Sequence, residues 1–237
     1  SKPSFDAQVQ IEGRVMNEPR MIDLSYTLTT DMLVYPGVER PVFQWMKRAN
    51  SENANVTKIT MIAHIGTHVD APKHFLDNVS CIDDIPLDRL FCAAKLFRYA
   101  QDLHQQEITL NDVQSTGFDL DDNMIFVLET GIQRYAETRQ YNECYPVPSQ
   151  ELCEWLIGKK IRAYMTDATS IDPLRSPDSL RHRLILGAGI PIVENLRNLD
   201  QLPVNTPFVI GAFPLKLQGR DGAPCRAVAL PDVERLG

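Results

Sequence analysis

Three of the five histidines in the chain lie within twelve residues, in the stretch HIGTHVDAPKHF at positions 64–75, and an aspartate lies between them. Two imidazole nitrogens and a carboxylate oxygen suit a catalytic zinc site, where water completes the coordination. Gly66 allows a sharp backbone turn after the first histidine. His68 and Asp70 are two residues apart, so they point the same way in an extended chain. We therefore predict that His64, His68 and Asp70 converge on one divalent metal ion.

The third histidine of this stretch, His74, is predicted to lie beside the site without binding the metal. A neutral imidazole next to a metal site suits general base and general acid work near neutral pH. His74 is therefore the candidate catalytic residue. From spacing alone, two other interpretations stay open, namely a buried polar network and a chance clustering of histidines.

A function of another class also fits such a cluster, namely a non-catalytic binding module that the ion only stabilises. A structural zinc site has a closed shell of four protein ligands. This alternative therefore needs a fourth protein ligand packed close to the first three. A non-ligating His74 nearby favours the enzyme.

Two further candidate ligands lie in RHRLILGAGIPIVEN, residues 181–195. His182 falls on a predicted helix, and Glu194 ends the strand-like segment that follows it. Taken alone, each is more typical of a structural histidine and a solvated or paired acid. Four aromatic residues are candidates for an apolar wall of a substrate pocket, although each is equally typical of a core: Tyr35, Phe43, Trp45 and Phe75.

The segments that must position these residues are mainly predicted strands, with short helices among them. Period-two patterns and apolar runs predict strands at 21–28, 41–47, 56–65, 93–100, 124–130, 161–167, 208–217 and 225–231. Helices are expected from Thr109, from Ser149 to Gly158 and within 178–187, with Ser149 as an N-cap. Residues 131–149 are expected to form a long loop. This pattern predicts an α/β or α+β domain built on a mixed sheet.

The size and charge of the chain limit the classes of function. Its 237 residues are expected to form one domain over 1–237, with residues 1–18 as an N-terminal extension. The formal net charge is −7, which disfavours phosphate backbones and anionic lipid, so neither nucleic acid nor membrane is an expected partner. The longest apolar run, residues 184–193, is far shorter than the roughly 20 residues of a membrane-spanning helix.

The cellular compartment is predicted from the cysteines and the N-terminal residues. Five cysteines without a CxxC pair are typical of reduced thiols in a cytoplasmic protein. The N-terminal residues are polar and lack the apolar core of a signal peptide.

The histidine-rich stretch resembles the signature H-x-G-T-H-x-D-x-P-x-H-F of the cyclase family of metal-dependent hydrolases. That family includes bacterial kynurenine formamidase, isatin hydrolase and trans-dienelactone hydrolase. Other similar stretches extend the resemblance over most of residues 20–236: YPG at 35–37, TG at 130–131, TDATSID at 166–172, LILGAGIPIVENL at 184–196 and GRDGAPCRAVAL at 219–230. The resemblance implies the family's swivelling β/β/α fold, a single domain with a barrel-like mixed sheet and flanking helices.

The resemblance also implies roles for single residues. In this family the first two histidines and the aspartate of the signature bind metal, and the third histidine, here His74, is catalytic. In the formamidases a second metal shares the aspartate and takes a histidine and a glutamate from the C-terminal half. The matching metal positions are His64, His68, Asp70, His182 and Glu194. Tyr35 stands where the formamidases carry a tryptophan, and it still offers a ring for stacking.

The function implied is hydrolysis of a C–N amide bond in a small aromatic or cyclic substrate by metal-activated water, as in kynurenine formamidase. Opening of the isatin lactam or of a dienelactone is the alternative. The donor set suits Zn²⁺ and also accepts Mn²⁺. The resemblance implies a homo-oligomer, a dimer or a tetramer, whose pocket walls can include a neighbouring subunit.

Overall fold

The computed structural model describes residues 10–11, 14–15, 21–99 and 107–232, so most of the expected extension over 1–18 lies outside the described residues. The strands are β1 (Gln10–Ile11), β2 (Arg14–Val15), β3 (Ile22–Asp23), β4 (Val42–Lys47), β5 (Val56–Thr60), β6 (His68–Asp70), β7 (Phe91–Arg98), β8 (Glu107–Ile108), β9 (Ile125–Glu129), β10 (Val147–Pro148), β11 (Tyr164–Thr166), β12 (Ile192–Glu194), β13 (Phe208–Pro214) and β14 (Gly222–Leu230). The α-helices are α1 (Ala49–Glu52), α2 (Leu87–Leu90), α3 (Leu110–Gln114), α4 (Gln140–Glu143), α5 (Gln150–Gly158) and α6 (Leu180–Gly187). Short 3₁₀ turns are η1 (Pro72–His74), η2 (Ile82–Asp84), η3 (Ile132–Tyr135) and η4 (Leu199–Gln201).

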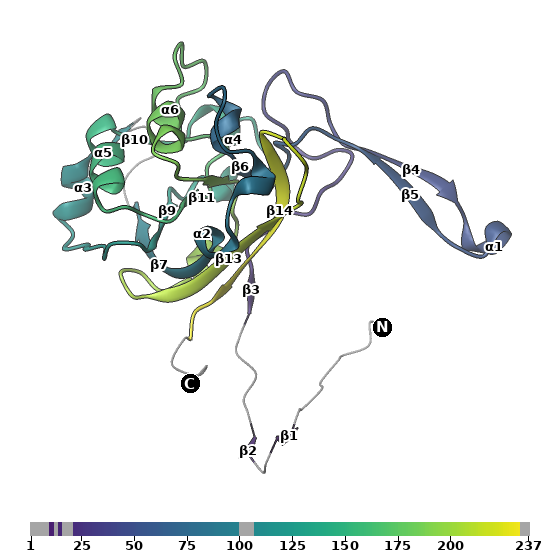
Figure 1. Ribbon diagram of the computed structural model, residues 1–237, viewed down its shortest axis with the longest axis horizontal. Helices are drawn as coiled ribbons and strands as arrows, with labels where there is room; N and C mark the ends of the chain where they lie inside the picture. Colours follow the sequence, from purple (N-terminus) through teal and green to yellow (C-terminus); the bar gives the residue numbers. More distant parts are fainter. Residues whose placement is uncertain (1–9, 12–13, 16–20, 100–106, 233–237) are drawn as a thin grey trace.

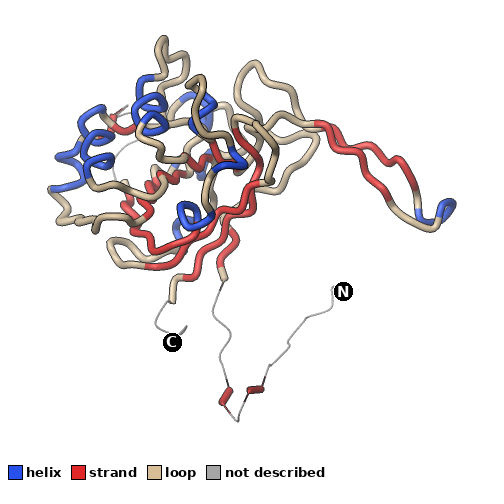
Figure 2. The backbone as a smooth tube through the Cα atoms, in the orientation of Figure 1, coloured by secondary structure: helices blue, strands red, loops and turns tan. Residues whose placement is uncertain are grey.

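A mixed sheet closes into a barrel, which confirms the predicted fold class. Its strand order is β13-β7-β9-β11-β12-β6-β14-β3, and β13 also pairs with β14, so the ring closes and β3 lies outside it. Strands β7, β9, β11 and β12 are parallel neighbours, whereas β12–β6, β6–β14, β14–β13 and β13–β7 are antiparallel. Closure leaves the ring without an unpaired edge (Figures 1 and 2).

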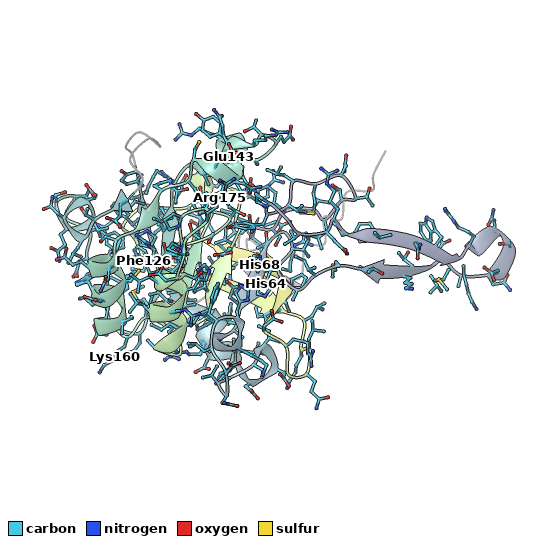
Figure 3. The ribbon with its side chains drawn as sticks, turned by 90° about the horizontal axis from the view of Figure 1, so that it is seen from above. His64, His68, Phe126, Glu143, Lys160 and Arg175 are labelled. Atoms are coloured by element: carbon cyan, nitrogen blue, oxygen red, sulfur yellow. The ribbon has the colours of Figure 1, made fainter. Side chains whose placement is uncertain are left out.

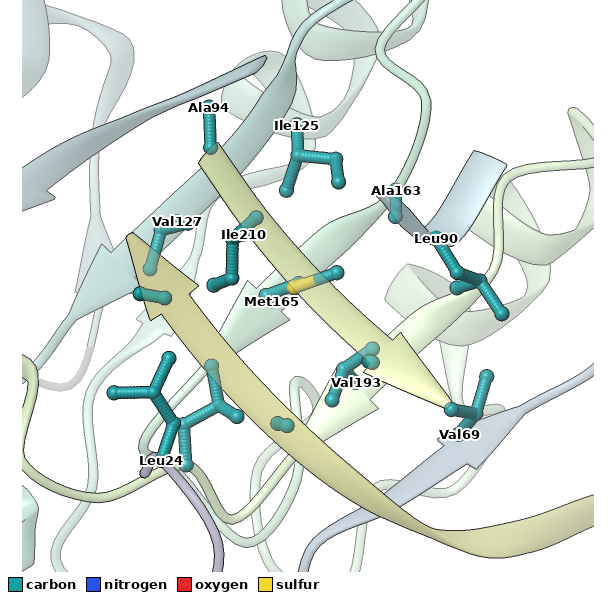
Figure 4. Close-up of a cluster of buried hydrophobic side chains, with 14 of the residues drawn as sticks. Leu24, Val69, Leu90, Ala94, Ile125, Val127, Ala163, Met165, Val193 and Ile210 are labelled. Carbon is teal, nitrogen blue, oxygen red and sulfur yellow. The ribbon is translucent and has the colours of Figure 1, made fainter. Parts of the chain in front are cut away.

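Alternation along the strands divides the apolar side chains between two cores. On β9, Ile125 and Val127 point into the barrel, whereas Phe126 and Leu128 point outward against the helices. The helical layer over the outer core comes from α5 and α6, which pack together. The barrel interior is filled mainly by small and branched side chains, and Figure 4 shows Ile125, Val127, Val193 and Ile210 there together with the unbranched Met165.

The same alternation sets the faces of the two strands that carry candidate site residues. Val69 on β6 belongs to the interior core, so His68 and Asp70 point to the outer face. On the antiparallel neighbour β12, Glu194 is paired with His68. The barrel therefore brings predicted ligands from two strands to the same outer surface.

The caps of two helices follow the local sequence. The Ser149 hydroxyl accepts a hydrogen bond from the Leu152 N–H at 3.1 Å, as an N-cap of α5. At α3, the Thr109 hydroxyl accepts from the Asp112 N–H at 3.1 Å, and the Asp112 carboxylate accepts from the Thr109 N–H at 2.8 Å. The single cap at Ser149 and the reciprocal cap at Thr109 confirm both predicted helix starts.

The segment 131–149 is not the structureless loop that its composition predicts. It contains η3, α4 and β10, and it packs a small core of its own around Ile132 and Tyr141. The Tyr141 hydroxyl donates to the Asp167 carbonyl oxygen at 2.8 Å. Tyrosines with an apolar ring and a polar end anchor this segment, a contact that periodicity does not reveal.

One hairpin projects from the barrel into solvent. We call residues 42–60 the arm: β4 and β5 pair only with each other among the described strands, and α1 forms the tip (Figure 1). Phe43 faces Ile59 and Trp45 faces Thr57 across the arm, so these residues share one face. Trp45 is 52% exposed and Ile59 is 55% exposed. Within the described residues, every helix is too short or too polar to span a bilayer.

Candidate metal centre

Three predicted ligands converge at the start of β6. The predicted strand 56–65 ends early, at Thr60, so His64 reaches the site from an irregular segment. Gly66 then turns the chain with φ +57°. The Asp70 Oδ1 atom lies 2.6 Å from His64 Nδ1 and 3.2 Å from His68 Nε2. Figure 3 shows His64 and His68 side by side.

Two residues from the C-terminal half complete a second group around the same aspartate. His182 on α6 has its Nε2 atom 3.2 Å from Glu194 Oε1 and 3.7 Å from Asp70 Oδ2. The donor atoms of Asp70, His182 and Glu194 all lie within 4.8 Å of one another, and so do those of His64, His68 and Asp70. The structure thus brings all five predicted ligands together in two triads that share Asp70.

The chemistry of this cluster fits divalent cations. Asp70 Oδ2 is buried and has no hydrogen-bond partner among the described residues, although a buried carboxylate oxygen is costly to leave unpaired. Burial raises the pKa of Glu194, and repulsion from Asp70 raises it further. Positive charge between Asp70 and Glu194 offsets both penalties. One triad offers two nitrogens and an oxygen, and the other offers a nitrogen and two oxygens, which are donors that Zn²⁺ and Mn²⁺ accept.

Each histidine of the two triads is held through its other ring nitrogen. His68 Nδ1 lies 2.8 Å from the Gly66 carbonyl oxygen, and His182 Nδ1 lies 2.7 Å from Asp172 Oδ2. Asp172 also accepts from the His182 N–H at 3.1 Å, so it fixes the start of α6 as well as the ring. His64 Nε2 lies 2.8 Å from Asp221 Oδ2.

Sequence reasoning missed Asp172 and Asp221. A ligating histidine normally donates its second N–H to an acid or a carbonyl, so the need for partners was foreseeable. Their identity was not, because Asp221 is 157 positions from His64 in the chain and only the β6–β14 pairing brings them together. His182 and Asp172 are ten positions apart, and no helical or strand period marks the pair.

His74, the predicted catalytic residue, stands beside the first triad. Its ring stacks on that of His64 with centroids 3.7 Å apart and an interplanar angle of 22°. Burial lowers the pKa of His74 to about 4, whereas the Asp70 and Asp221 carboxylates outweigh burial and raise the pKa of His64 to about 9. The uncharged form of His74 therefore prevails at neutral pH.

A cavity of about 1390 Å³ opens over the cluster. Of the four aromatic residues predicted to form its wall, Tyr35 and Phe75 line it, and Phe75 packs 4.5 Å from the His182 ring. Phe43 and Trp45 do not line it, because they lie on β4 and the arm carries them away from the barrel. Phe43 and Trp45 are close to the histidine stretch in sequence, but this closeness does not predict whether their strand points toward the cavity or away from it.

Comparisons with known proteins place the chain among proteins of similar sequence and fold. The family model Cyclase matches residues 22–173. The chain is 30% identical over 225 residues to kynurenine formamidase from Bacillus mycoides (strain KBAB4), covering 91% of this chain and 100% of that protein. Its fold matches isatin hydrolase A from Labrenzia aggregata bound to benzyl benzoate with a TM-score of 0.80, at 25% identity over 89% of this chain and 93% of that one. It also matches a potential metal-dependent hydrolase with cyclase activity with a TM-score of 0.75, at 25% identity over 89% of this chain and 96% of that one.

Proposed function

The chain belongs to the cyclase family of metal-dependent hydrolases, and from this premise we propose that it hydrolyses a C–N amide bond in a small aromatic or cyclic substrate. The observation that carries the proposal is the pair of donor triads that share Asp70 under an open cavity, with no hydrogen-bond partner for Asp70 Oδ2 in the described part of the chain. Water adds to the acyl carbon, the C–N bond breaks, and a carboxylic acid and an amine leave. A non-catalytic module needs a closed donor shell, which the open cavity disfavours.

The proposed ligand sets follow the two triads. His64, His68 and Asp70 would hold the first ion. Asp70, His182 and Glu194 would hold the second. A bound divalent ion supplies Lewis acidity that lowers the pKa of bound water far below that of bulk water, to about 7, and polarises a carbonyl oxygen. Asp70 belongs to both triads, with Oδ1 facing His64 and His68 and Oδ2 facing His182, so it would contribute to both sites. We propose Zn²⁺ or Mn²⁺ as the ion.

His74 is the proposed proton carrier. It is uncharged at neutral pH, so its free nitrogen can take the proton that the attacking water loses. The same nitrogen can then deliver that proton to the leaving amine. The stack on His64 keeps the imidazole ring beside the first triad. His74 would thus act as general base and then as general acid.

The proposed substrate sits between Tyr35 and Phe75 in the cavity. Both side chains are partly exposed there, and an aromatic ring of the substrate can pack on them. An N-formylated aromatic amine is the first candidate because the chain has a ligand residue at every position of both triads that a formamidase-like site requires. The 0.80 TM-score to isatin hydrolase A favours lactam opening as the second candidate, and a dienelactone is the third.

A turnover screen tests this proposal. The metal-free protein is reloaded with zinc or manganese and assayed with N-formylkynurenine, isatin and a trans-dienelactone. We expect turnover of N-formylkynurenine that depends on the added metal and is lost in Asp70→Ala. Faster turnover of isatin would move the assignment to lactam opening. Failure to cleave any acyl bond with either metal would overturn the hydrolase proposal.

We further propose that the arm packs on a second copy of this chain, which makes the protein a homo-oligomer. An isolated two-stranded hairpin is marginally stable in water, and a cluster of exposed apolar side chains marks an interaction surface. The arm carries Trp45, Met46 and Ile59 at 52%, 60% and 55% exposure. It also holds three basic residues and one acidic residue in a chain of net charge −7, so its charge complements another copy.

The oligomer proposal is tested by the mass of the protein in solution. Light scattering after size exclusion should give a dimer or tetramer for the unsubstituted chain and a monomer for the double variant Trp45→Glu with Ile59→Glu. Leu87→Glu is the matched control, because Leu87 is 61% exposed on α2 of the barrel. A monomeric unsubstituted chain, or a double variant that keeps its mass, would contradict the proposal.

We also propose a cytoplasmic location for this single-domain enzyme. All five cysteines are free, and Cys153 is fully buried in the outer core. Unpaired thiols in this number fit a reducing compartment. Fractionation of the cells that make the protein, with a thiol assay on the isolated chain, tests the location.

A further inference from the structure

We propose that Asp221 is a positioning residue that holds both His64 and His74, an inference that rests on the proposed metal site. Its Oδ2 atom lies 2.8 Å from His64 Nε2 and 3.6 Å from His74 Nδ1. One carboxylate therefore lies against a proposed ligand and against the proposed proton carrier. No other described carboxylate lies within ion-pair distance of His74.

The contact with His64 decides which nitrogen of that ring faces the metal. With the Nε2 proton donated to Asp221, the lone pair that His64 would offer a metal is the one on Nδ1, the atom that lies 2.6 Å from Asp70 Oδ1. A carboxylate on the far nitrogen fixes the tautomer of a ligating histidine, orients its ring and raises its basicity. His68 and His182 obtain the same support from the Gly66 carbonyl and from Asp172.

The backbone on both sides of Asp221 is fixed by the barrel. Its carbonyl oxygen accepts from the Ala71 N–H at 2.9 Å, and the next residue, Gly222, is paired with Asp70. A Cβ atom on Gly222 would lie 2.7 Å from His64 Cε1, so the absence of a side chain there lets the His64 ring approach β14. The pairing of β6 with β14 thus places the carboxylate and leaves space for the ring at once.

The contact with His74 completes the arrangement. Because His64 and His74 are stacked, one carboxylate at the edge of the stack can face a nitrogen of each ring. Asp221 has 43% of its side chain exposed, so it adds little to the stability of the fold. Its effect is expected on metal affinity and on ring orientation.

Zinc affinity measured by chelator competition tests this inference. We expect Asp221→Ala to weaken zinc binding by about 10- to 100-fold, the usual loss on removing such a partner. The melting temperature of the metal-free protein should not change. Asp221→Asn keeps an oxygen that accepts the Nε2 proton, so it should bind zinc with intermediate affinity. Asp88→Asn is the matched control for loss of one negative charge, since Asp88 is 69% exposed and pairs with Arg162.

The tautomer gives a readout that a purely structural role would not move. Long-range ¹H–¹⁵N spectra of the zinc-loaded protein should show His64 protonated at Nε2, and Asp221→Ala should lose or reverse this preference. Zinc binding by Asp221→Ala as tight as in Asp88→Asn, with an unchanged His64 spectrum, would overturn this inference alone. Absence of zinc binding by the unsubstituted protein would overturn the metal site and this inference together.

Discussion

Replacing Gly222 with alanine would push the first triad apart from the side of β14. A Cβ atom at this position lies 2.7 Å from His64 Cε1 and 2.7 Å from the Val69 carbonyl oxygen. Both distances fall short of ordinary van der Waals contact by about 0.7 Å. The Val69 oxygen belongs to the backbone of β6 and cannot turn away. The methyl group must therefore displace His64, or the two strands must separate.

The expected losses follow from this displacement. Overpacking of a well-packed site costs about 1–3 kcal/mol in the free energy of unfolding. Misplacing a reacting group by about 1 Å can cost about 10²-fold in rate, so a shift of about 0.7 Å should lower kcat/KM by tens of fold. The loss should come with weaker zinc binding, because the displaced residue is a proposed ligand.

Gly158→Ala is the matched control for the same chemical change. Gly158 is the last residue of α5, and nothing lies within 4 Å of a Cβ atom built on it. Alanine in a helix is favoured over glycine by roughly 0.5–1 kcal/mol, so this variant should unfold at equal or higher urea concentration. Urea unfolding and steady-state turnover of the two variants give the comparison. A Gly222→Ala protein as stable and as active as Gly158→Ala would refute the close approach of His64 to β14.

Three further predictions address His74, Asp172 and the buried Asp167. His74→Ala should lower turnover by at least about 10²-fold, while elemental analysis finds its metal content unchanged; equal turnover would remove His74 from the reaction. Asp172→Ala removes the partner of His182 Nδ1, so it should weaken binding of the second ion by about 10- to 100-fold in a zinc titration. Burial raises the pKa of Asp167 from 3.8 to about 6, so its contribution to stability is present at low pH and is lost as the pH rises through about 6. In Asp167→Asn, the measured free energy of unfolding should therefore fall less steeply as the pH rises from 4 to 7. An unchanged slope would mean that another group causes the pH dependence.

The sequence predicted the features that depend on local order. Ser149 and Thr109 cap helices because a short polar side chain reaches its own backbone, and the signal lies within four residues. The convergence of His68 and Asp70 follows from the strand period and needs no tertiary information. Resemblance added His182 and Glu194, which spacing alone could not single out.

Features that depend on tertiary pairing escaped prediction. The alternating pattern continues past Thr60, yet the strand ends there because β5 has β4 as its sole partner among the described strands, and β4 begins at Val42. The direction of the arm depends on this isolated pairing, so Phe43 and Trp45 could not be separated from the cavity in advance. Asp221 reaches His64 only because a closed barrel sets β14 against β6. Closure of the barrel brings together residues that lie far apart in the sequence and that no helical or strand period relates.

Anomalous diffraction from crystals of the zinc- or manganese-loaded protein tests the central claim most directly. Two peaks are expected on opposite sides of the Asp70 carboxylate, one bound by His64 and His68 and the other by His182 and Glu194. Each zinc peak should lie about 2.0–2.2 Å from its protein donors. A data set with ample metal and no peak inside this cluster would contradict the account.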